Sequence, residues 1–173
     1  MNPDPLVVQL PVSALTTLSR RCSTLGDAGV RALREAGYRA GIELFPQLDE
    51  APEQLPPSTF WLAVDGEMRR LGLGSVSFLP VTRELATVAW RGSPEARGPR
   101  SDPGIPCCHF ASGLLAGLLS RAAGQTVAVV EARCRSMGSE PCWFMVGSPD
   151  RVRALPAKRG AQRALHEVLA PEP

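Results

Sequence analysis

The chain has 173 residues, which is enough for one domain with a sizeable hydrophobic core. Nineteen basic residues nearly balance 17 acidic ones, so the charge does not indicate a protein that binds nucleic acid or a membrane surface. The N-terminus lacks the features of an export signal, and the longest apolar run, 114–119, is too short to span a bilayer. We therefore expect a cytoplasmic protein without a membrane span, whose five cysteines are reduced or bound to metal.

The first half of the chain predicts three helices. A short amphipathic segment at 12–22 precedes a longer helix at 27–45, which Pro46 should end. Its apolar residues are expected to face the core: Val30, Leu33, Tyr38, Ile42 and Phe45. After a Pro-rich break, Ser58 is the expected N-cap of a third helix that reaches Leu71.

The second half predicts two hairpins separated by a helix. Its elements are strands at 74–80 and 84–90, a loop at 93–106, a helix at 107–123, strands at 126–134 and 141–147, and a weakly helical tail. This order predicts an α+β fold in which helices flank an antiparallel sheet of hairpins. We expect one ligand-binding domain over 1–148 and a polar tail over 149–173. The helical region 10–50 is the expected dimer element.

Three cysteines and a glutamate in the second half have the chemistry of a metal site. Cys134 and Cys142 flank the turn of the last hairpin, Glu131 lies near the end of its first strand, and Cys108 begins the preceding helix. Thiolates and a carboxylate suit a closed, tetrahedral zinc site. Glu131 and Cys134 are three residues apart, so a twist or bulge is needed to turn both side chains to one side.

Other interpretations of these residues remain open from the sequence. The thiols are buried side chains without metal in one alternative, and in another Cys134 and Cys142 form a disulfide across the hairpin. Cys107 or His109 could replace Cys108 as a ligand. Cys22 is expected to be a small buried side chain. Two glycines four residues apart, Gly113 and Gly117, favour tight packing of their helix on the sheet over a ligand role.

Several segments resemble a known family. The stretches CHFASGLLAGL, GQTVAVVEARC and GSEPCWF are similar to the 4-vinyl reductase domain. The stretch VAWRGSPEA, at 88–96, resembles the sensor domains of phenol- and xylene-responsive activators of aromatic catabolism. The likeness extends over residues 5–148. It implies the fold of that family, which vesicle-tethering TRAPP subunits share.

The resemblance also implies a set of site residues. It makes Cys108, Glu131, Cys134 and Cys142 the ligands of a structural zinc beside a buried pocket for an aromatic ligand. Trp90 matches a tryptophan whose indole N–H helps to hold a phenolic hydroxyl, and Trp61 and Phe60 are further ligand-binding candidates. The chain has no histidine upstream of the cysteines, where the family has its pocket histidine, so an apolar ligand suits it better than a phenol.

Together these features predict a stand-alone, zinc-stabilised sensory or binding module without an output domain. Its expected ligand is a small hydrophobic or aromatic molecule, and its expected partners are a second copy of the chain and a regulatory protein. No serine-nucleophile elbow, phosphate-binding loop or dinucleotide fingerprint is present in the sequence, so an enzyme is not expected. The alternatives are a protein-interaction scaffold or lipid-binding protein resembling TRAPP subunits, and a tetrapyrrole-handling accessory protein.

Overall fold

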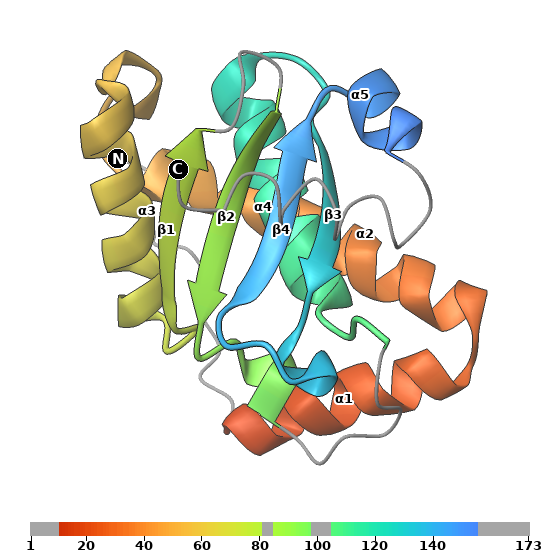
Figure 1. The fold of residues 1–173 in the computed structure, drawn as a ribbon. Coiled ribbons are helices and arrows are strands. Elements are labelled where there is room, and N and C mark those ends of the chain that lie inside the picture. Colours follow the sequence, from red (N-terminus) through yellow and green to blue (C-terminus); the bar gives the residue numbers. More distant parts are fainter. Residues whose placement is uncertain (1–10, 81–84, 98–104, 156–173) are drawn as a thin grey trace, which may run out of the picture.

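The computed structural model describes residues 11–80, 85–97 and 105–155 (Figure 1). The predicted tail beyond residue 155, the turn of the first hairpin at 81–84 and the loop portion 98–104 lie outside the described residues. The described helices are α1 (Val12–Thr24), α2 (Asp27–Leu44), α3 (Pro57–Arg70), α4 (His109–Ala123) and α5 (Pro149–Ala154). The short 3-10 turns are η1 (Phe45–Gln47), η2 (Pro52–Gln54), η3 (Pro94–Arg97) and η4 (Arg135–Met137).

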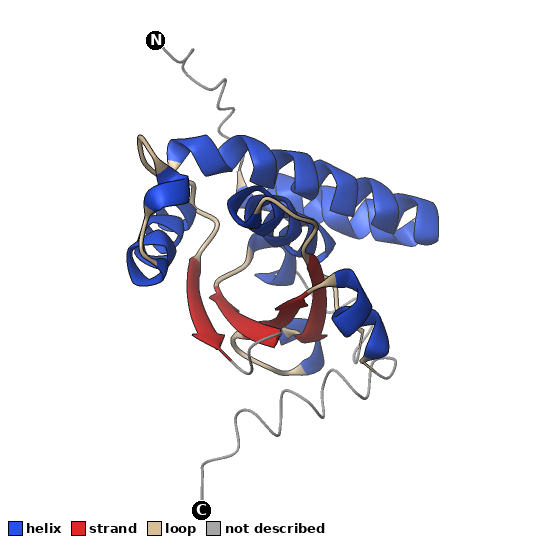
Figure 2. Ribbon diagram, turned by 90° about the horizontal axis from the view of Figure 1, so that it is seen from above, coloured by secondary structure: helices blue, strands red, loops and turns tan. Residues whose placement is uncertain are grey.

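Four strands form one antiparallel sheet in the order β1-β2-β4-β3. Their bounds are β1 (Ser75–Pro80), β2 (Leu85–Arg91), β3 (Ala128–Arg133) and β4 (Cys142–Gly147). The two predicted hairpins are confirmed, and they join through the antiparallel pairing of β2 with β4. Figure 2 shows the long helices gathered on one side of the sheet. The α+β fold predicted from the sequence is therefore confirmed.

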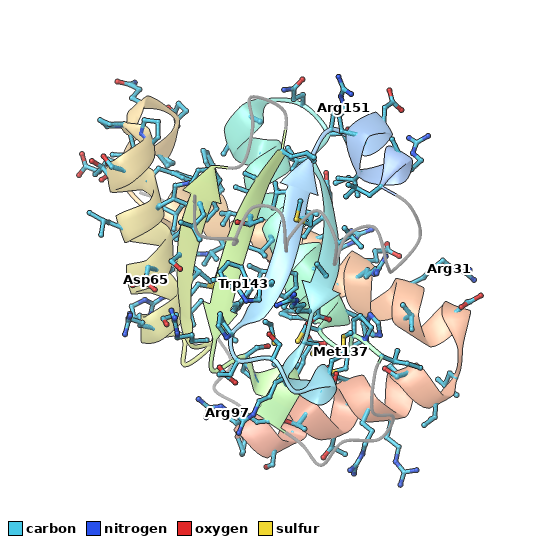
Figure 3. All side chains as sticks on the ribbon, viewed as in Figure 1. Arg31, Asp65, Arg97, Met137, Trp143 and Arg151 are labelled. Atoms are coloured by element: carbon cyan, nitrogen blue, oxygen red, sulfur yellow. The ribbon has the colours of Figure 1, made fainter. Side chains whose placement is uncertain are left out.

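The main core lies between the sheet and the helices. The innermost side chains, which have no solvent exposure, include Val64 and Met68 of α3, Leu115 of α4, Val88 of β2 and Phe144 of β4. Helix α3 is also tied to the first strand, because Oδ1 of Asp65 accepts a hydrogen bond from the backbone N–H of Val76 at 2.8 Å. Asp65 lies on α3 beside β1 (Figure 3). Helix α3 begins one residue before the predicted cap Ser58, after Pro56 as its N-cap, so that cap prediction was wrong.

Helices α2 and α4 meet backbone to backbone. A Cβ atom on Gly37 would lie 2.1 Å from the carbonyl oxygen of Phe110, and one on Gly117 would lie 2.0 Å from that of Tyr38. Gly41 and Gly113 make equally close approaches to the opposite helix. The tight packing predicted for Gly113 and Gly117 is thus present, but the surface they pack on is α2 and not the sheet.

This contact changes the buried face of α2. Leu33 and Phe45 are buried as predicted, whereas Ile42 is 38% exposed. The buried residues of α2 are Gly29, Leu33, Gly37, Gly41 and Leu44. None of the helices in the described part of the chain has the length and apolar character needed to cross a bilayer.

Candidate metal centre

The four predicted ligands come together at the end of the sheet where α4 begins. Cys108 is the N-cap residue of α4, Glu131 lies in β3, Cys134 follows β3, and Cys142 is the first residue of β4. All four are buried, and one ligand atom from each lies within 4.8 Å of every other. The sulfur atoms are 3.8 Å apart for Cys108 and Cys134, 3.7 Å for Cys108 and Cys142, and 3.9 Å for Cys134 and Cys142.

These sulfur separations fit a tetrahedral metal ion. Zinc–sulfur bonds of about 2.3 Å in tetrahedral geometry place two ligand sulfurs roughly 3.8 Å apart. Oε2 of Glu131 accepts a hydrogen bond from the backbone N–H of Cys108 at 2.9 Å, while its buried Oε1 has no hydrogen-bond partner. A buried carboxylate oxygen without a partner is costly unless a cation neutralises it. The cluster of three cysteines and one glutamate can therefore bind a metal ion.

Local backbone features direct these side chains inward. The pairing register of β3 with β4 shifts between Glu131 and Arg133, which confirms the predicted irregularity. After Cys134, the turn η4 ends at Gly138, whose φ of 87° is in the left-handed region that favours glycine. The carbonyl oxygen of Cys134 accepts hydrogen bonds from the N–H groups of Met137 and Ser139. The turn is thereby closed, and Cys134 and Cys142 face the same space.

The electrostatics of the cluster favour a bound cation. Burial, followed by the negative charge at Cys134, raises the pKa of Glu131 well above its usual value. Hydrogen bonding to the neighbouring thiols and burial likewise raise the pKa of Cys108. The pKa of Cys134 is lowered, because the thiols of Cys107, Cys108 and Cys142 donate to its sulfur. The buried groups thus share protons among themselves, and a metal ion binds such groups by replacing those protons.

Two alternatives drawn from the sequence are not supported. Cys134 and Cys142 are free thiols whose sulfur atoms are 3.9 Å apart, so no disulfide crosses the hairpin. The metal-binding group among the described residues includes Cys108, and neither Cys107 nor His109 takes its place. Burial, together with the charge of Arg34, lowers the pKa of His109.

Glu95 is a buried residue whose role the sequence did not reveal. It lies in η3, inside the segment predicted as a loop, and its carboxylate accepts hydrogen bonds from the backbone N–H groups of Phe110 (3.0 Å) and Ala111 (2.7 Å). Ser19 of α1 donates to the same carboxylate at 3.1 Å. Glu95 therefore holds the first turn of α4 and joins it to α1. No local sequence pattern could have indicated this role of Glu95, because α4, whose N–H groups it binds, begins after a long loop.

The three ligand-binding candidates belong to one hydrophobic core. Phe60 and Trp61 reach it from α3, and Trp90 reaches it from β2. Phe60 and Trp61 of α3 are in edge-to-face contact, and Trp61 stacks on Phe78 of β1 with ring centroids 4.7 Å apart. Trp90 of β2 is 1% exposed, and its Nε1–H donates to the carbonyl oxygen of Leu73 at 2.7 Å. Its indole N–H therefore already has a backbone partner. A surface groove lies between α2 and the C-terminal end of α4, and none of the three aromatic residues lines it.

The comparison with family models covers the part of the chain that carries these four residues. Residues 86–148 match the model of the 4-vinyl reductase domain. All four clustered residues and Trp90 lie in this range, so the resemblance that the sequence motifs indicated is confirmed there. No curated protein matches the chain.

Solved structures confirm the fold. The phenol-responsive sensory domain of the transcription activator PoxR, solved with phenol, is 18% identical with a TM-score of 0.70, covering 96% of this chain and 85% of that one. A vinyl-4-reductase family protein from Methanocaldococcus jannaschii is 17% identical with a TM-score of 0.55, covering 82% and 83%. A trafficking protein particle complex subunit 3 from Naegleria fowleri, covalently bound to palmitic acid, is 10% identical with a TM-score of 0.57, covering 79% and 89%.

Proposed function

We propose that this chain is a ligand-sensing module that a zinc ion stabilises and that binds a small hydrophobic, aromatic molecule. One observation carries the proposal. Three cysteine sulfurs 3.7 to 3.9 Å apart and the unpaired oxygen of Glu131 surround one point, in a fold similar to a sensory domain. That relative was solved with phenol.

Zinc would have a structural role in this module. Four protein donors fill a tetrahedral shell, so no position is left for a catalytic water. Cys108, Glu131, Cys134 and Cys142 would hold the ion, which would join the start of α4 to the turn between β3 and β4. The energy of metal binding would thus add to the stability of the folded state.

The ligand proposal rests on the aromatic core next to this cluster. Trp90, Trp61 and Phe60 belong to the core or pack against it, as do the buried cluster residues Cys108, Cys134 and Cys142. A ligand hydroxyl increases binding affinity when the site offers a polar group that has no other hydrogen-bond partner. Here the indole N–H of Trp90 is bonded to Leu73, and the sequence has no histidine before His109. We therefore propose an apolar aromatic ligand in place of a phenol.

Signalling would use the N-terminal helices, in the region 10–50. Helix α1 carries two strongly exposed leucines, Leu18 (56% exposed) and, just after its end, Leu25 (71% exposed). Exposed large apolar side chains close together are typical of interaction surfaces. We propose that α1 and α2 form a homodimer interface and that a regulatory protein recognises the ligand-bound dimer.

The experiment combines metal analysis with ligand binding. Protein purified without chelator should contain one zinc per chain by inductively coupled plasma mass spectrometry. Toluene and phenol are a matched pair of ligands of similar size, and calorimetric titration should show tighter binding of toluene. A zinc content far below one per chain refutes the metal part of the proposal. The absence of binding by any monocyclic aromatic compound refutes the sensing part.

A second candidate function is the binding of a fatty acyl chain within a protein-interaction scaffold. It is favoured by the similarity to the trafficking complex subunit, whose structure contains covalently bound palmitic acid. Native mass spectrometry distinguishes the two candidates. A mass increment of a long acyl chain on the purified protein supports the scaffold, and a chain without this increment that binds toluene supports the sensor.

A further inference from the structure

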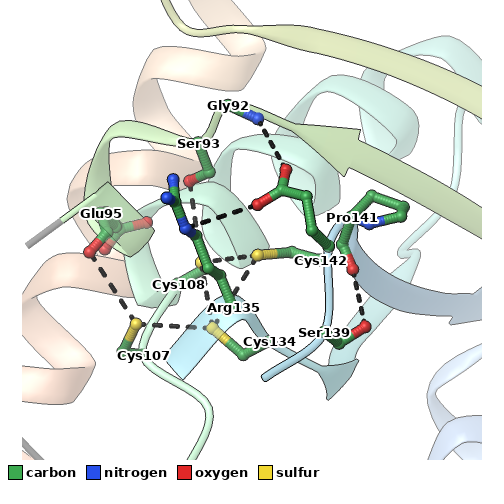
Figure 4. Close-up of polar contacts among 11 residues, drawn as sticks. Gly92, Ser93, Glu95, Cys107, Cys108, Cys134, Arg135, Ser139, Pro141 and Cys142 are labelled. Carbon is green, nitrogen blue, oxygen red and sulfur yellow. Dashed lines mark hydrogen bonds and ion pairs between the residues drawn. The ribbon is translucent and has the colours of Figure 1, made fainter. Parts of the chain in front are cut away.

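A fourth thiol lies beside the cluster of three cysteines and one glutamate without belonging to it. The thiol of Cys107 is 3.5 Å from the sulfur of Cys134 and donates to the carbonyl oxygen of Glu95 at 3.8 Å. Figure 4 shows Cys107 between Glu95 and Cys134. Cys107 is half-buried, whereas Cys108, Cys134 and Cys142 are buried. Among these four thiols, Cys107 is thus on the solvent side, next to one of the proposed metal ligands.

We propose that Cys107 is a redox modification site: a hydroperoxide joins it to Cys134 in a disulfide, and this reaction releases the metal ion. The proposal rests on the zinc site described under Proposed function. It makes the cluster a sensor of oxidants as well as a structural element. The metal-binding group among the described residues is complete without Cys107.

The two sulfurs are close enough for a disulfide to form after a short movement. A disulfide needs its sulfurs about 2.05 Å apart, so the 3.5 Å separation of Cys107 and Cys134 must close by roughly 1.5 Å. Cys107 lies in the segment before α4, and Cys134 lies just after the end of β3. Neither residue lies inside an α-helix or a strand, so a movement of their side chains leaves the hydrogen bonds of α4 and of the sheet in place, and Cys134 keeps its place as the N-cap residue of η4. Cys142, by contrast, belongs to β4.

The reaction balances with peroxide as the oxidant. The sulfur of Cys107 attacks one peroxide oxygen, the O–O bond breaks, and the other oxygen leaves as water with the proton of Cys107. Cys107 is then a sulfenic acid. The sulfur of Cys134 attacks the Cys107 sulfur, the S–S bond forms, and the S–O bond breaks. The hydroxyl leaves as a second water after taking a proton from solvent, so the two sulfurs together lose two electrons to one peroxide.

The disulfide removes a ligand from the proposed zinc site. Once Cys134 is bonded to Cys107, only Cys108, Cys142 and Glu131 remain as protein donors. A three-donor site binds zinc more weakly than a closed shell of four. The disulfide also links the turn after β3 to the segment before α4, which the metal linked before. A dithiol reductant should reverse the change and let zinc bind again.

The test uses the full chain loaded with zinc. Wild type, Cys107→Ser and the control Cys22→Ser are treated with equal amounts of hydrogen peroxide, and released zinc is followed with a chromophoric chelator. Cys22 is a half-buried cysteine in α1 and is therefore a matched control. Wild type and Cys22→Ser should each release one zinc per chain. The mass of the metal-free polypeptide should fall by about 2 Da, because disulfide formation removes two hydrogens. Peptide mapping should show a Cys107–Cys134 link, and Cys107→Ser should release zinc at least about tenfold more slowly.

Each result decides the proposal. Equal rates of zinc release from wild type and Cys107→Ser overturn it, as does a disulfide between any other pair. If Cys107→Ser does not fold, peptide mapping of oxidised wild type still decides it. Metal analysis before oxidation tests the Proposed function separately. A chain without zinc that still forms the Cys107–Cys134 disulfide refutes the zinc site and confirms the modification site.

Discussion

Gly117 in α4 lies so close to Tyr38 in α2 that a Cβ atom on the glycine would be 2.0 Å from the tyrosine carbonyl oxygen. The obstructing atom belongs to a backbone, so it cannot turn away as a side chain would. We predict that Gly117→Ala destabilises the protein by about 3 kcal/mol or more, since overpacking against a rigid neighbour is at the upper end of such costs. Chemical denaturation measures this change.

Gly66 provides the control for this prediction. It lies in the interior of α3, and a Cβ atom there would have nothing within 4 Å. Because alanine favours a helix over glycine, Gly66→Ala should stabilise the protein by roughly 0.5–1 kcal/mol. If the two variants have similar stability, the close approach of α2 and α4 is wrong.

Removal of the carboxylate from the cluster should weaken metal binding. Glu131→Gln keeps the hydrogen bond from the N–H of Cys108 but replaces an anionic donor by a neutral amide. Loss of even an outer partner of a ligand costs roughly 10- to 100-fold in metal affinity, so loss of a ligand should cost at least about tenfold. Competition with a chromophoric chelator measures the affinity.

The matched control is Glu140→Gln, in the turn that connects β3 and β4. The side chain of Glu140 is 48% exposed, and Oε1 accepts a hydrogen bond from the N–H of Gly92. This variant should bind zinc like wild type. Chelation of zinc from wild type should also lower its melting temperature, and Glu131→Gln should show a smaller decrease. Equal affinity in Glu131→Gln and wild type contradicts the assignment of Glu131 as a ligand.

Trp90→Phe tests whether the indole N–H belongs to the fold or to the ligand. The variant leaves the carbonyl oxygen of Leu73 without its donor, which should cost roughly 1–3 kcal/mol. The ratio of the affinities for toluene and phenol should not change, because the N–H is bonded to the backbone. Thermal unfolding and calorimetric titration give the two values. Trp143→Phe is the control, since Trp143 lies on the opposite face of the sheet (Figure 3). A loss of phenol affinity alone in Trp90→Phe would show that a ligand takes this donor.

Glu95 should make stability depend on pH. Burial raises the pKa of Glu95 from 4.5 to about 7, although the N–H groups of Ala111 and Phe110 and the hydroxyl of Ser19 act in the opposite direction. The folded state therefore holds a proton on Glu95 between pH 4.5 and about 7 that the unfolded state releases. This contribution to stability is fully present below pH 4.5 and is lost as the pH rises through about 7.

The comparison with Glu95→Gln isolates this effect. The free energy of unfolding of wild type, minus that of Glu95→Gln, should decrease between about pH 5 and pH 8. Both proteins are measured with saturating zinc, so that protonation of the metal ligands cancels in the difference. A difference that is constant with pH would mean that Glu95 keeps one protonation state across this range.

The proposed dimer can be tested on α1. The double variant Leu18→Glu and Leu25→Glu should change a particle with the mass of two chains into one with the mass of a single chain. Multi-angle light scattering measures this mass. Leu62→Glu on α3 is the control, because Leu62 is as exposed, at 72%, but lies outside the region 10–50. A wild type with the mass of one chain at all concentrations refutes the dimer.

The sequence predicted that Cys108, Glu131, Cys134 and Cys142 come together, because this cluster depends on residue type. Cysteine pairs and a glutamate at the neck of a hairpin have few other uses, and the hairpins followed from strand patterns and turn residues. Cys108 needed more information, since its partners are distant in sequence and the resemblance to a family linked them. The strand bounds differ from those predicted by only one or two residues, which reflects how sharply turn residues end strands.

The buried face of α2 could not be predicted in the same way. The periodicity of apolar residues predicts which side chains are buried, and it correctly predicted that Leu33 is buried. Gly37 and Gly41 are buried for another reason, which is that two backbones approach each other there. Because glycine has no side chain, it does not contribute to a pattern of apolar side chains. Glu95 was missed because its partners, the N–H groups of Phe110 and Ala111, are backbone atoms and leave no trace in residue type.

The contact between α2 and α4 also determines how the two helices can move. Where helices meet through side chains, small rotamer changes let one slide on the other. At Gly37, Gly41, Gly113 and Gly117 no such layer exists, and carbonyl oxygens of each helix lie directly against the other. We therefore expect α2 and α4 to move as one unit. A displacement of the first turn of α4, next to Cys108, should then also displace α2.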